Sequence, residues 1–302
     1  MLWLKLDLMT NTSTENKNLS ILLLAATSLI WGTSFILIKK AIVVFAPLEV
    51  GALRIFYAFL AFIPIFWVHR KKIPNKMWGW ILLAGLIGSL FPSLLFSWAG
   101  TKIQSSLSGM LNAVTPLFTV LVGSLLFKQK FTAQQWIGIL IGLCGAIVLG
   151  FMKPGGAIEI NWFIMPVIFA TLLYALNVNL LKIKFAGIPP LILSASTIVA
   201  VGPIATIILF GFTDFSHKIL HTPGAIHAAG YVAILGLLGT ALALVLFNRL
   251  IQISGPLTAS SVTYIMPVVS VFWGLADGEP FGIIQGMGLL GILAGVYMVN
   301  RK

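Results

Sequence analysis

The carboxylates of this chain stand at the borders of its apolar stretches rather than inside them. The sequence holds 7 Asp and Glu residues, namely Asp7, Glu15, Glu49, Glu159, Asp214, Asp277 and Glu279. A carboxylate buried within a membrane can relay protons, and only Glu49 and Glu279 stand close enough to an apolar stretch to be coupling candidates. Because both lie at stretch ends, the sequence favours facilitated diffusion, or coupling through another group, over a buried carboxylate relay.

Arg54 is the one basic residue that stands well inside an apolar stretch. At a rise of about 1.5 Å per residue, it lies roughly 9 Å from the end of its expected helix. A charge at that depth is costly unless it is paired or solvated. Two interpretations stay open: Arg54 faces a cavity and attracts a substrate carboxylate, or it pairs with Glu49 or bonds helix-end carbonyls.

Neutral polar and aromatic side chains stand near the centres of several apolar stretches. They are Trp31, Asn112, Tyr174, Asn177, Asn179 and Tyr264. Hydrogen-bonding groups beside aromatic walls suit a cavity for small amphiphilic ligands. Each residue taken alone is better explained by bonding between packed helices. For the set, the sequence predicts a cavity, with Arg54 as a further candidate for its lining.

Prolines and glycines inside the stretches indicate kinks and close helix contacts. Pro116 and Pro267 are the best candidates for gating kinks, because they occupy matching places in the two halves described below. The pairs Gly138/Gly142 and Gly291/Gly295 have the GxxxG spacing that lets two helices approach closely. Internal packing explains such pairs more often than dimerisation does.

The sequence does not favour an enzyme. It contains no phosphate-binding P-loop, and no Ser/His/Asp constellation stands out. His217 and His221 are four residues apart, but only Asp214 accompanies them, so we expect no metal site. No catalytic residue and no cofactor is expected. A membrane-embedded enzyme would need clustered His, Asp or Glu at a depth that water reaches.

The composition is that of a membrane protein. Of the 302 residues, 59% are hydrophobic and 9% are charged, whereas soluble domains carry roughly 25% charged residues. So few charges could not cover a water-facing surface, so the partner of the apolar residues is the lipid bilayer. The formal net charge of +12 comes mostly from short segments between apolar runs, which argues against nucleic-acid binding.

Ten apolar runs are each able to cross roughly 30 Å of hydrocarbon as a helix. They lie near residues 20–38, 48–68, 77–99, 105–127, 134–152, 161–181, 190–212, 225–248, 256–275 and 281–299. We divide the chain into an N-terminal tail at 1–19, a first five-helix unit at 20–152 and a second at 161–299. Pro47, Pro190 and Pro256 are expected to begin spans, and 153–160 and 213–224 to be the longer loops.

The basic residues give an orientation. If the N-terminus is cytoplasmic, 13 Lys and Arg residues fall in inside segments and 5 in outside segments. The cluster of Arg70, Lys71, Lys72 and Lys76 is the strongest single determinant. The positive-inside rule therefore places both termini in the cytoplasm.

The chain repeats itself. A shift of 143 residues places Trp31 on Tyr174, Lys39 on Lys182 and Pro47 on Pro190, and a shift of 151 places Pro116 on Pro267 and Gly123 on Gly274. Because each half would have five spans, the second half enters from the opposite side and the repeats are inverted. Inverted repeats around a midplane site are a recurring transporter architecture.

These features resemble the EamA-type branch of the drug/metabolite transporter superfamily. The residues that carry the resemblance are 31–35 (WGTSF), Pro47 with 52–54 (ALR), 108–116, and 257–267 (LTASSVTYIMP). The resemblance covers nearly the whole chain, is specific for the family and says little about the substrate. It implies an all-α membrane protein of ten helices in the bacterial inner membrane that exports amino acids or related metabolites.

One position departs from the family pattern. Family members usually carry Glu just after the fourth and ninth spans, and here Glu279 fills the second position while Lys128 stands at the first. If that pair served topology or coupling, half of it is missing.

Alternatives within and outside the transporter class remain. An importer or a nucleotide-sugar-like carrier would need more basic residues at the midplane than Arg54 alone. A channel or a purely structural bundle is not excluded by the repeat. The expected partners are the lipid bilayer and a small-molecule substrate, in a chain that is a monomer or a homodimer.

Overall fold

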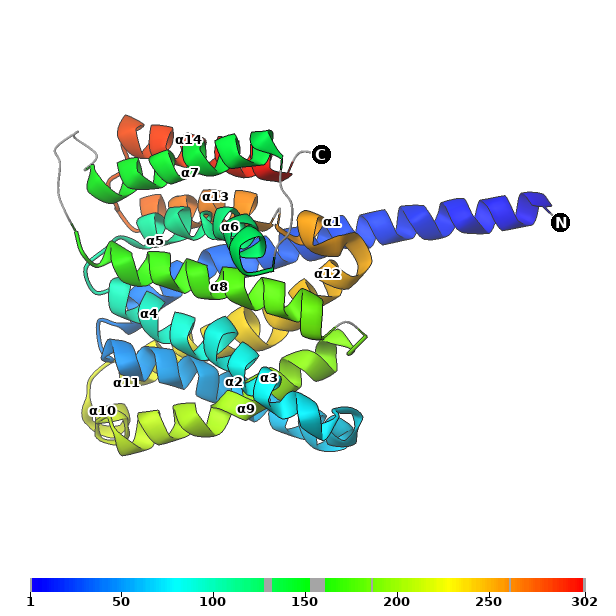
Figure 1. The fold of residues 1–302 in the computed structure, drawn as a ribbon. Helices are drawn as coiled ribbons and strands as arrows, with labels where there is room; N and C mark the ends of the chain where they lie inside the picture. The colour runs from blue at the N-terminus through cyan, green and yellow to red at the C-terminus, as the bar shows by residue number, and fades with distance from the viewer. Residues whose placement is uncertain (1, 128–131, 153–160, 186, 261, 301–302) are drawn as a thin grey trace.

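The computed structural model describes residues 2–127, 132–152, 161–185, 187–260 and 262–300, and it is a bundle of helices (Figure 1). The long apolar helices lie side by side and run back and forth across the bundle. α1 (Leu2–Ala41) projects beyond the bundle at its N-terminal end, and α14 (Ile283–Asn300) ends on that same side. The predicted tail at 1–19 is therefore continuous with the first apolar helix from Leu2 onwards.

In the first half, some apolar runs form one helix and others are divided into two or three helical segments. They are α1, α2 (Pro47–His69), α3 (Trp78–Gly85), the π-helical segment η3 (Leu86–Leu90), α4 (Phe91–Ala99), α5 (Ser105–Asn112), α6 (Thr115–Phe127) and α7 (Ala133–Phe151). Two short turns of 3₁₀ helix, η1 (Arg70–Lys72) and η2 (Asn75–Met77), join α2 to α3.

The second half follows the same plan. Its elements are α8 (Ile164–Lys184), α9 (Pro190–Gly211), α10 (Phe215–His221), α11 (Ala225–Gly236), the π-helical segment η4 (Leu237–Leu242), α12 (Ala243–Ser260), α13 (Val262–Ala276) and α14. The two π-helical segments, η3 and η4, begin 151 residues apart, which is the offset that also relates Pro116 to Pro267.

Seven helical segments within the described ranges are long and apolar enough to cross a membrane. They are Asn18–Ala41, Pro47–Lys72, Asn75–Ala99, Ser105–Leu126, Ile164–Lys184, Pro190–Gly211 and Ala225–Ser254. The other three predicted runs correspond to shorter apolar helices, Ala133–Leu149, Val262–Ala276 and Ile283–Val299. The structure thus gives an all-helical membrane protein, with every predicted run on a helix.

Two boundaries differ from the sequence prediction. Pro256 does not begin a span, because α12 continues through it to Ser260 and α13 begins at Val262. The segment 213–224, predicted to be a loop, contains the short helix α10. The predicted loop at 153–160 lies outside the described residues, as does Lys128.

The helix pair α7 and α14 is packed through glycine. A Cβ atom added to Gly295 would lie 2.4 Å from the carbonyl oxygen of Gly138, and one added to Gly145 would lie 2.6 Å from that of Gly288. Only hydrogen at these positions lets the two backbones approach so closely. The predicted internal packing through the glycine pairs is therefore confirmed, and it joins the last helix of each half.

The bundle places apolar side chains outside and many polar side chains inside. Large apolar residues such as Trp67, Leu290 and Ile283 are exposed, whereas Ser194, Ser196 and Thr171 are fully buried. Buried Ser196 donates to the carbonyl of Ile192, 2.7 Å away on its own helix. Apolar side chains on the outside and hydrogen-bonded polar side chains inside are the distribution that a helical bundle in lipid requires.

Candidate functional site

A cavity of about 400 Å³ lies inside the bundle and is lined by helices of both halves. Its first-half lining comes from α1, α2, η3, α4, α5, α6 and α7, and its second-half lining from α8, η4, α12, α13 and α14. Near one end it is bordered by Gln135, Lys182 and Val299, and Lys182 is exposed. No residue from the connections at the opposite end, such as 99–107 or 274–283, lines it. The cavity therefore reaches the surface at one end of the bundle and stops short of the other.

Six of the seven predicted lining residues border this cavity. They are Trp31, Arg54, Asn112, Tyr174, Asn177 and Asn179. Tyr264 is not among the lining residues. Its neighbours Thr263 and Met266 do line the cavity, so Tyr264 lies on a different side of α13, because successive helix residues are turned by roughly 100°.

The two predicted kink prolines lie in different settings. Pro116 lines the cavity just after a break, because α5 ends at Asn112 and α6 begins at Thr115. The hydroxyl of Thr115 donates to the freed carbonyl of Asn112 over 2.8 Å. Pro267 lies within the continuous helix α13 and is not part of the lining.

Trp31 forms one wall of the cavity and is held by a hydrogen bond. Its indole Nε1 donates to the carbonyl oxygen of Gly239 over 2.9 Å, and its ring lies 4.8 Å from that of Phe247. Tyr174, its mate at the 143-residue offset, stacks on Phe96 with a centroid distance of 6.1 Å. The cavity thus has aromatic walls from both halves.

Arg54 is buried at the cavity and does not pair with Glu49. Its Nε donates to Thr240 Oγ1 over 2.7 Å, and a terminal nitrogen lies 3.5 Å from the Gly239 carbonyl oxygen. Glu49 instead accepts from the backbone N–H of Ala46 at 2.6 Å and from Lys218 at 2.9 Å. The structure therefore combines the two interpretations of Arg54, a cavity position and a carbonyl contact, without the ion pair.

The π-helical segments supply matching corners of the site. Gly88 in η3 lies against Asn177, so a Cβ there would be 2.2 Å from the amide nitrogen. Gly239 in η4 lies against Ser34, where a Cβ would be 3.0 Å from the hydroxyl oxygen. Ser34 and Asn177 are 143 residues apart, so the two halves place the same contact on opposite sides of the cavity. Such π-helical turns are frequent at functional sites.

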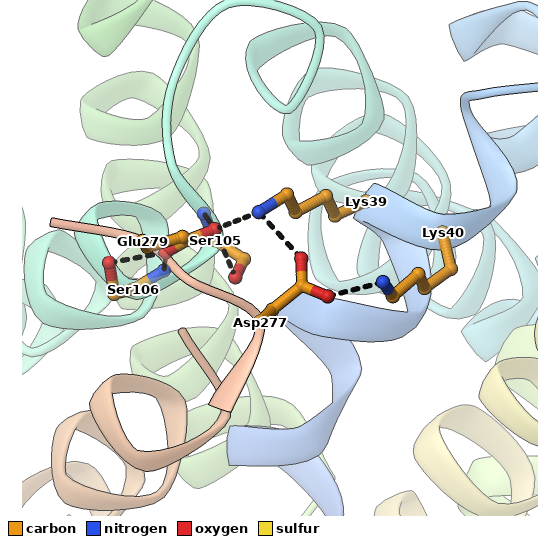
Figure 2. A network of polar contacts seen from close by, with 6 residues as sticks. All are labelled: Lys39, Lys40, Ser105, Ser106, Asp277 and Glu279. Carbon is orange, nitrogen blue, oxygen red and sulfur yellow. Dashed lines mark hydrogen bonds and ion pairs between the residues drawn. The ribbon is translucent and has the colours of Figure 1, made fainter. Parts of the chain in front are cut away.

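A cluster of charged groups lies outside the cavity lining and joins segments far apart in the sequence (Figure 2). Lys39 lies 2.7 Å from Glu279 Oε1 and 2.8 Å from Asp277 Oδ2, and Lys40 also pairs with Asp277. Lys39 and Lys40 come from α1, whereas Asp277 and Glu279 lie between α13 and α14. This cluster, which we call the end latch, joins the first half to the second.

Glu279 also caps α5. Its two carboxylate oxygens accept from the backbone N–H groups of Ser105 and Ser106, each at 2.9 Å, and from both hydroxyls at 2.8 and 2.6 Å. A carboxylate satisfies the free N–H groups of a helix N-terminus and complements its dipole. Burial alone would raise the pKa of Glu279, but the bonds from Lys39, Ser106 and Ser105 outweigh it and lower the pKa to about 2. Glu279 is therefore firmly ionised at neutral pH.

Asp277 is the more exposed carboxylate of the latch. Hydrogen bonds from Lys39 and then Lys40 hold the pKa of Asp277 below its ordinary value. Glu49 and Glu279, the two predicted coupling candidates, thus both lie in ion pairs and away from the cavity lining.

Comparison with known proteins decides the family. The model of the EamA-like transporter family matches residues 18–151 and again residues 161–301. The chain belongs to the EamA-like transporter family. The repeat predicted from the sequence is therefore confirmed as two EamA halves, in a multi-pass membrane transporter rather than an enzyme.

Two bacterial relatives match this EamA-like transporter over nearly the whole chain. It is 23% identical to the uncharacterized transporter sll0355 of Synechocystis, over 96% of this chain and 92% of that protein. It is 26% identical to the uncharacterized inner membrane transporter YedA of Escherichia coli K12, over 92% of this chain and 89% of that protein.

A shorter match carries a more specific name. A protein of Escherichia coli K12 named probable amino-acid metabolite efflux pump is 28% identical, over 40% of this chain and 39% of that protein. A solved crystal structure of another protein shares the fold with a TM-score of 0.61, at 17% identity over 92% of this chain and 95% of that chain.

Proposed function

We propose that this EamA-like transporter is a secondary carrier that moves small metabolites by alternating access between its two halves. The observation that carries the proposal is the cavity, which both halves line and which reaches the surface at one end, while no residue of the end latch lines it. A carrier needs a central site that opens to one side at a time, and paired halves can exchange the two shapes.

The proposed topology has ten membrane-spanning helices in two inverted repeats of five, with both termini in the cytoplasm of a bacterial cell. Support comes from the excess of Lys and Arg in the inside segments, and from the common end of the bundle at which α1 projects and α14 ends. On this topology the cavity faces the cytoplasm and the end latch closes the outer side. YedA, named an inner membrane transporter, supports the inner membrane as location.

The proposed substrates are amino acids or related compounds, and the proposed direction is export. The name of the partial relative, amino-acid metabolite efflux pump, points this way. The cavity is compatible, because its volume of about 400 Å³ suits a small molecule and its walls combine aromatic rings with amide and hydroxyl groups.

Facilitated diffusion is the proposed energetic mode. Among the described residues that line the cavity there is no Asp or Glu. A proton relay through Glu279 would need that group to gain a proton near neutral pH, whereas its pKa is about 2.

Flux into proteoliposomes tests the proposed function. Purified protein is reconstituted and the uptake of a panel of labelled amino acids is measured with and without an imposed pH gradient. Saturable movement without the gradient is expected. Accumulation only with the gradient would contradict facilitated diffusion but keep the carrier, and non-saturating flux would indicate a channel.

The aromatic walls give a second test. Replacing Trp31 or Tyr174 with Ala is expected to reduce saturable flux by roughly tenfold, because a ring contact and, for Trp31, a hydrogen bond to Gly239 are lost. Trp67, which is exposed on the outside of α2, provides the control, and Trp67→Ala should transport normally. Flux that is unchanged in both Trp31→Ala and Tyr174→Ala would remove these residues from the site.

A further inference from the structure

We infer that the cavity recognises a zwitterion, with Arg54 binding the ligand carboxylate and the side-chain oxygen of Asn177 accepting from its ammonium group. This inference rests on the proposed carrier function and specifies how its substrate is held. It assigns opposite ends of one small molecule to groups from the two halves of the chain.

The first support is the unbalanced charge of Arg54. The residue is 9% exposed and its hydrogen-bond partners are the neutral Thr240 hydroxyl and Gly239 carbonyl. A guanidinium carries five N–H donors, so most of its donors remain available on the cavity side. A buried cation within a membrane span is costly unless an anion joins it, and within the described part of the lining no carboxylate does so. A ligand carboxylate would supply that anion in a bidentate geometry.

The second support is a pair of carboxamide oxygens without a donor. The Oδ1 atoms of Asn112 and Asn177 are buried at the cavity and accept no hydrogen bond. A buried acceptor without a partner is costly, so a ligand N–H group that reached it would bind with a clear gain. Donors on the ligand thus match the acceptors that the protein leaves open.

The third support is position. Arg54 lines the cavity from α2, and Tyr174 and Asn177, three residues apart, line it from α8. Residues three apart lie on the same face of a helix at roughly 5–6 Å between Cβ atoms. Arg54 from the first half and Asn177 from the second therefore border one cavity.

The held position of Asn177 strengthens the assignment. The carboxamide of Asn177 packs on Gly88, and a Cβ atom at position 88 would displace that carboxamide. Gly88 belongs to η3, the π-helical segment, and also lines the cavity. The side chain is therefore fixed by the backbone of the neighbouring span, as a binding group should be.

The test compares three probes of one shape on the purified full chain. The probes are leucine, leucinamide, which lacks the carboxylate, and 4-methylpentanoate, which lacks the ammonium group. Binding is measured by isothermal titration calorimetry. Wild type is expected to bind leucine roughly 10- to 100-fold more tightly than either analogue, because each loses a hydrogen bond with a charged group.

The variants separate the two ends of the ligand. Arg54→Gln should lose affinity for leucine and 4-methylpentanoate but not for leucinamide, so that leucine and leucinamide bind about equally. Arg54→Lys should restore part of that preference, since it keeps the charge. Asn177→Ala should instead remove the preference for leucine over 4-methylpentanoate. Thermal melting of each variant confirms folding, and Trp67→Ala is the matched surface control.

The outcomes distinguish this inference from the carrier proposal. If Arg54→Gln folds and keeps the preference for leucine over leucinamide, the Arg54 assignment is overturned while the carrier stands. If the wild type shows saturable flux only for compounds without a carboxylate, the inference is likewise overturned and the carrier stands. Absence of saturable flux for every labelled compound would overturn the carrier proposal itself.

Discussion

Replacing Glu279 with Gln is expected to lower the free energy of unfolding by about 3 kcal/mol at pH 7. The carboxylate, whose side chain is 4% exposed, accepts from Lys39 and from the N–H and O–H groups of Ser105 and Ser106. A carboxamide can accept at one oxygen only, and its NH₂ group would face the donors of α5. The variant therefore leaves buried donors unpaired, which costs more than the loss of an exposed ion pair.

The effect should depend on pH with a definite sign. The pKa of Glu279 is lowered from 4.5 to about 2, so its stabilisation is fully present above about pH 5 and is lost as the pH falls toward 2. The difference in melting temperature between wild type and Glu279→Gln, measured in detergent, should thus be at least halved at pH 3. A difference that stays constant from pH 7 to pH 3 would contradict the low pKa.

Asp277 provides the comparison within the same latch. It pairs with Lys39 and Lys40, but its side chain is 20% exposed and it caps no helix. Exposed ion pairs contribute roughly 0–1 kcal/mol. Asp277→Asn should therefore destabilise the protein much less than Glu279→Gln. Equal losses would mean that the cap on α5 contributes little.

Replacing Gly295 with Ala is expected to destabilise the protein by about 3 kcal/mol or more. The added Cβ would lie 2.4 Å from the Gly138 carbonyl oxygen and 2.6 Å from the Gly142 backbone nitrogen. Backbone atoms cannot rotate away as a side chain can, so α7 and α14 must separate, and overpacking of this kind costs roughly 1–3 kcal/mol even where side chains give way.

Gly286 on the same helix is the matched control. A Cβ there would have nothing within 4 Å, so Gly286→Ala should be neutral or slightly stabilising through its higher helix propensity. Size-exclusion profiles and melting temperatures of the two variants check the prediction. If Gly295→Ala melts with wild type, the close approach of α7 and α14 is not required for the fold.

The spans could be predicted because their signal is local. An apolar run of sufficient length specifies a membrane helix with little reference to the rest of the chain. Pro47 and Pro190 begin α2 and α9 as predicted, since proline fits the first turn of a helix. The prediction that Pro256 begins a span was wrong, because α12 continues past it. Proline alone does not decide where a membrane helix begins or ends.

Much of the cavity lining could also be predicted, because polar groups in the middle of a span are costly in lipid and therefore face other helices or a cavity. Trp31, Asn112 and Tyr174 follow that rule, whereas Tyr264 does not, since it lies on a different side of α13 from the lining residues Thr263 and Met266. The orientation of one side chain around a helix depends on packing that the sequence does not state.

The end latch could not be found from spacing. Lys39 and Glu279 are 240 residues apart, and no local pattern relates them. The π-helical segments were missed for a different reason, because a π turn forms where tertiary contacts favour it rather than where propensity does. One signal was present: Gly88 and Gly239 are separated by the 151 residues that relate Pro116 to Pro267.

The two π-helical segments also constrain how the sequence can change. A π turn holds one residue more than the α-helical turn it replaces, so every side chain beyond it is rotated by roughly 100° about the helix axis. Beyond η3 this rotation sets the direction of Phe96, and beyond η4 that of Phe247, both of which line the cavity. Deletion of a single residue from either segment would rotate the lining residues of the helix that follows it away from the cavity. A one-residue gap at 86–90 or 237–242 in a relative would therefore mark a differently shaped site.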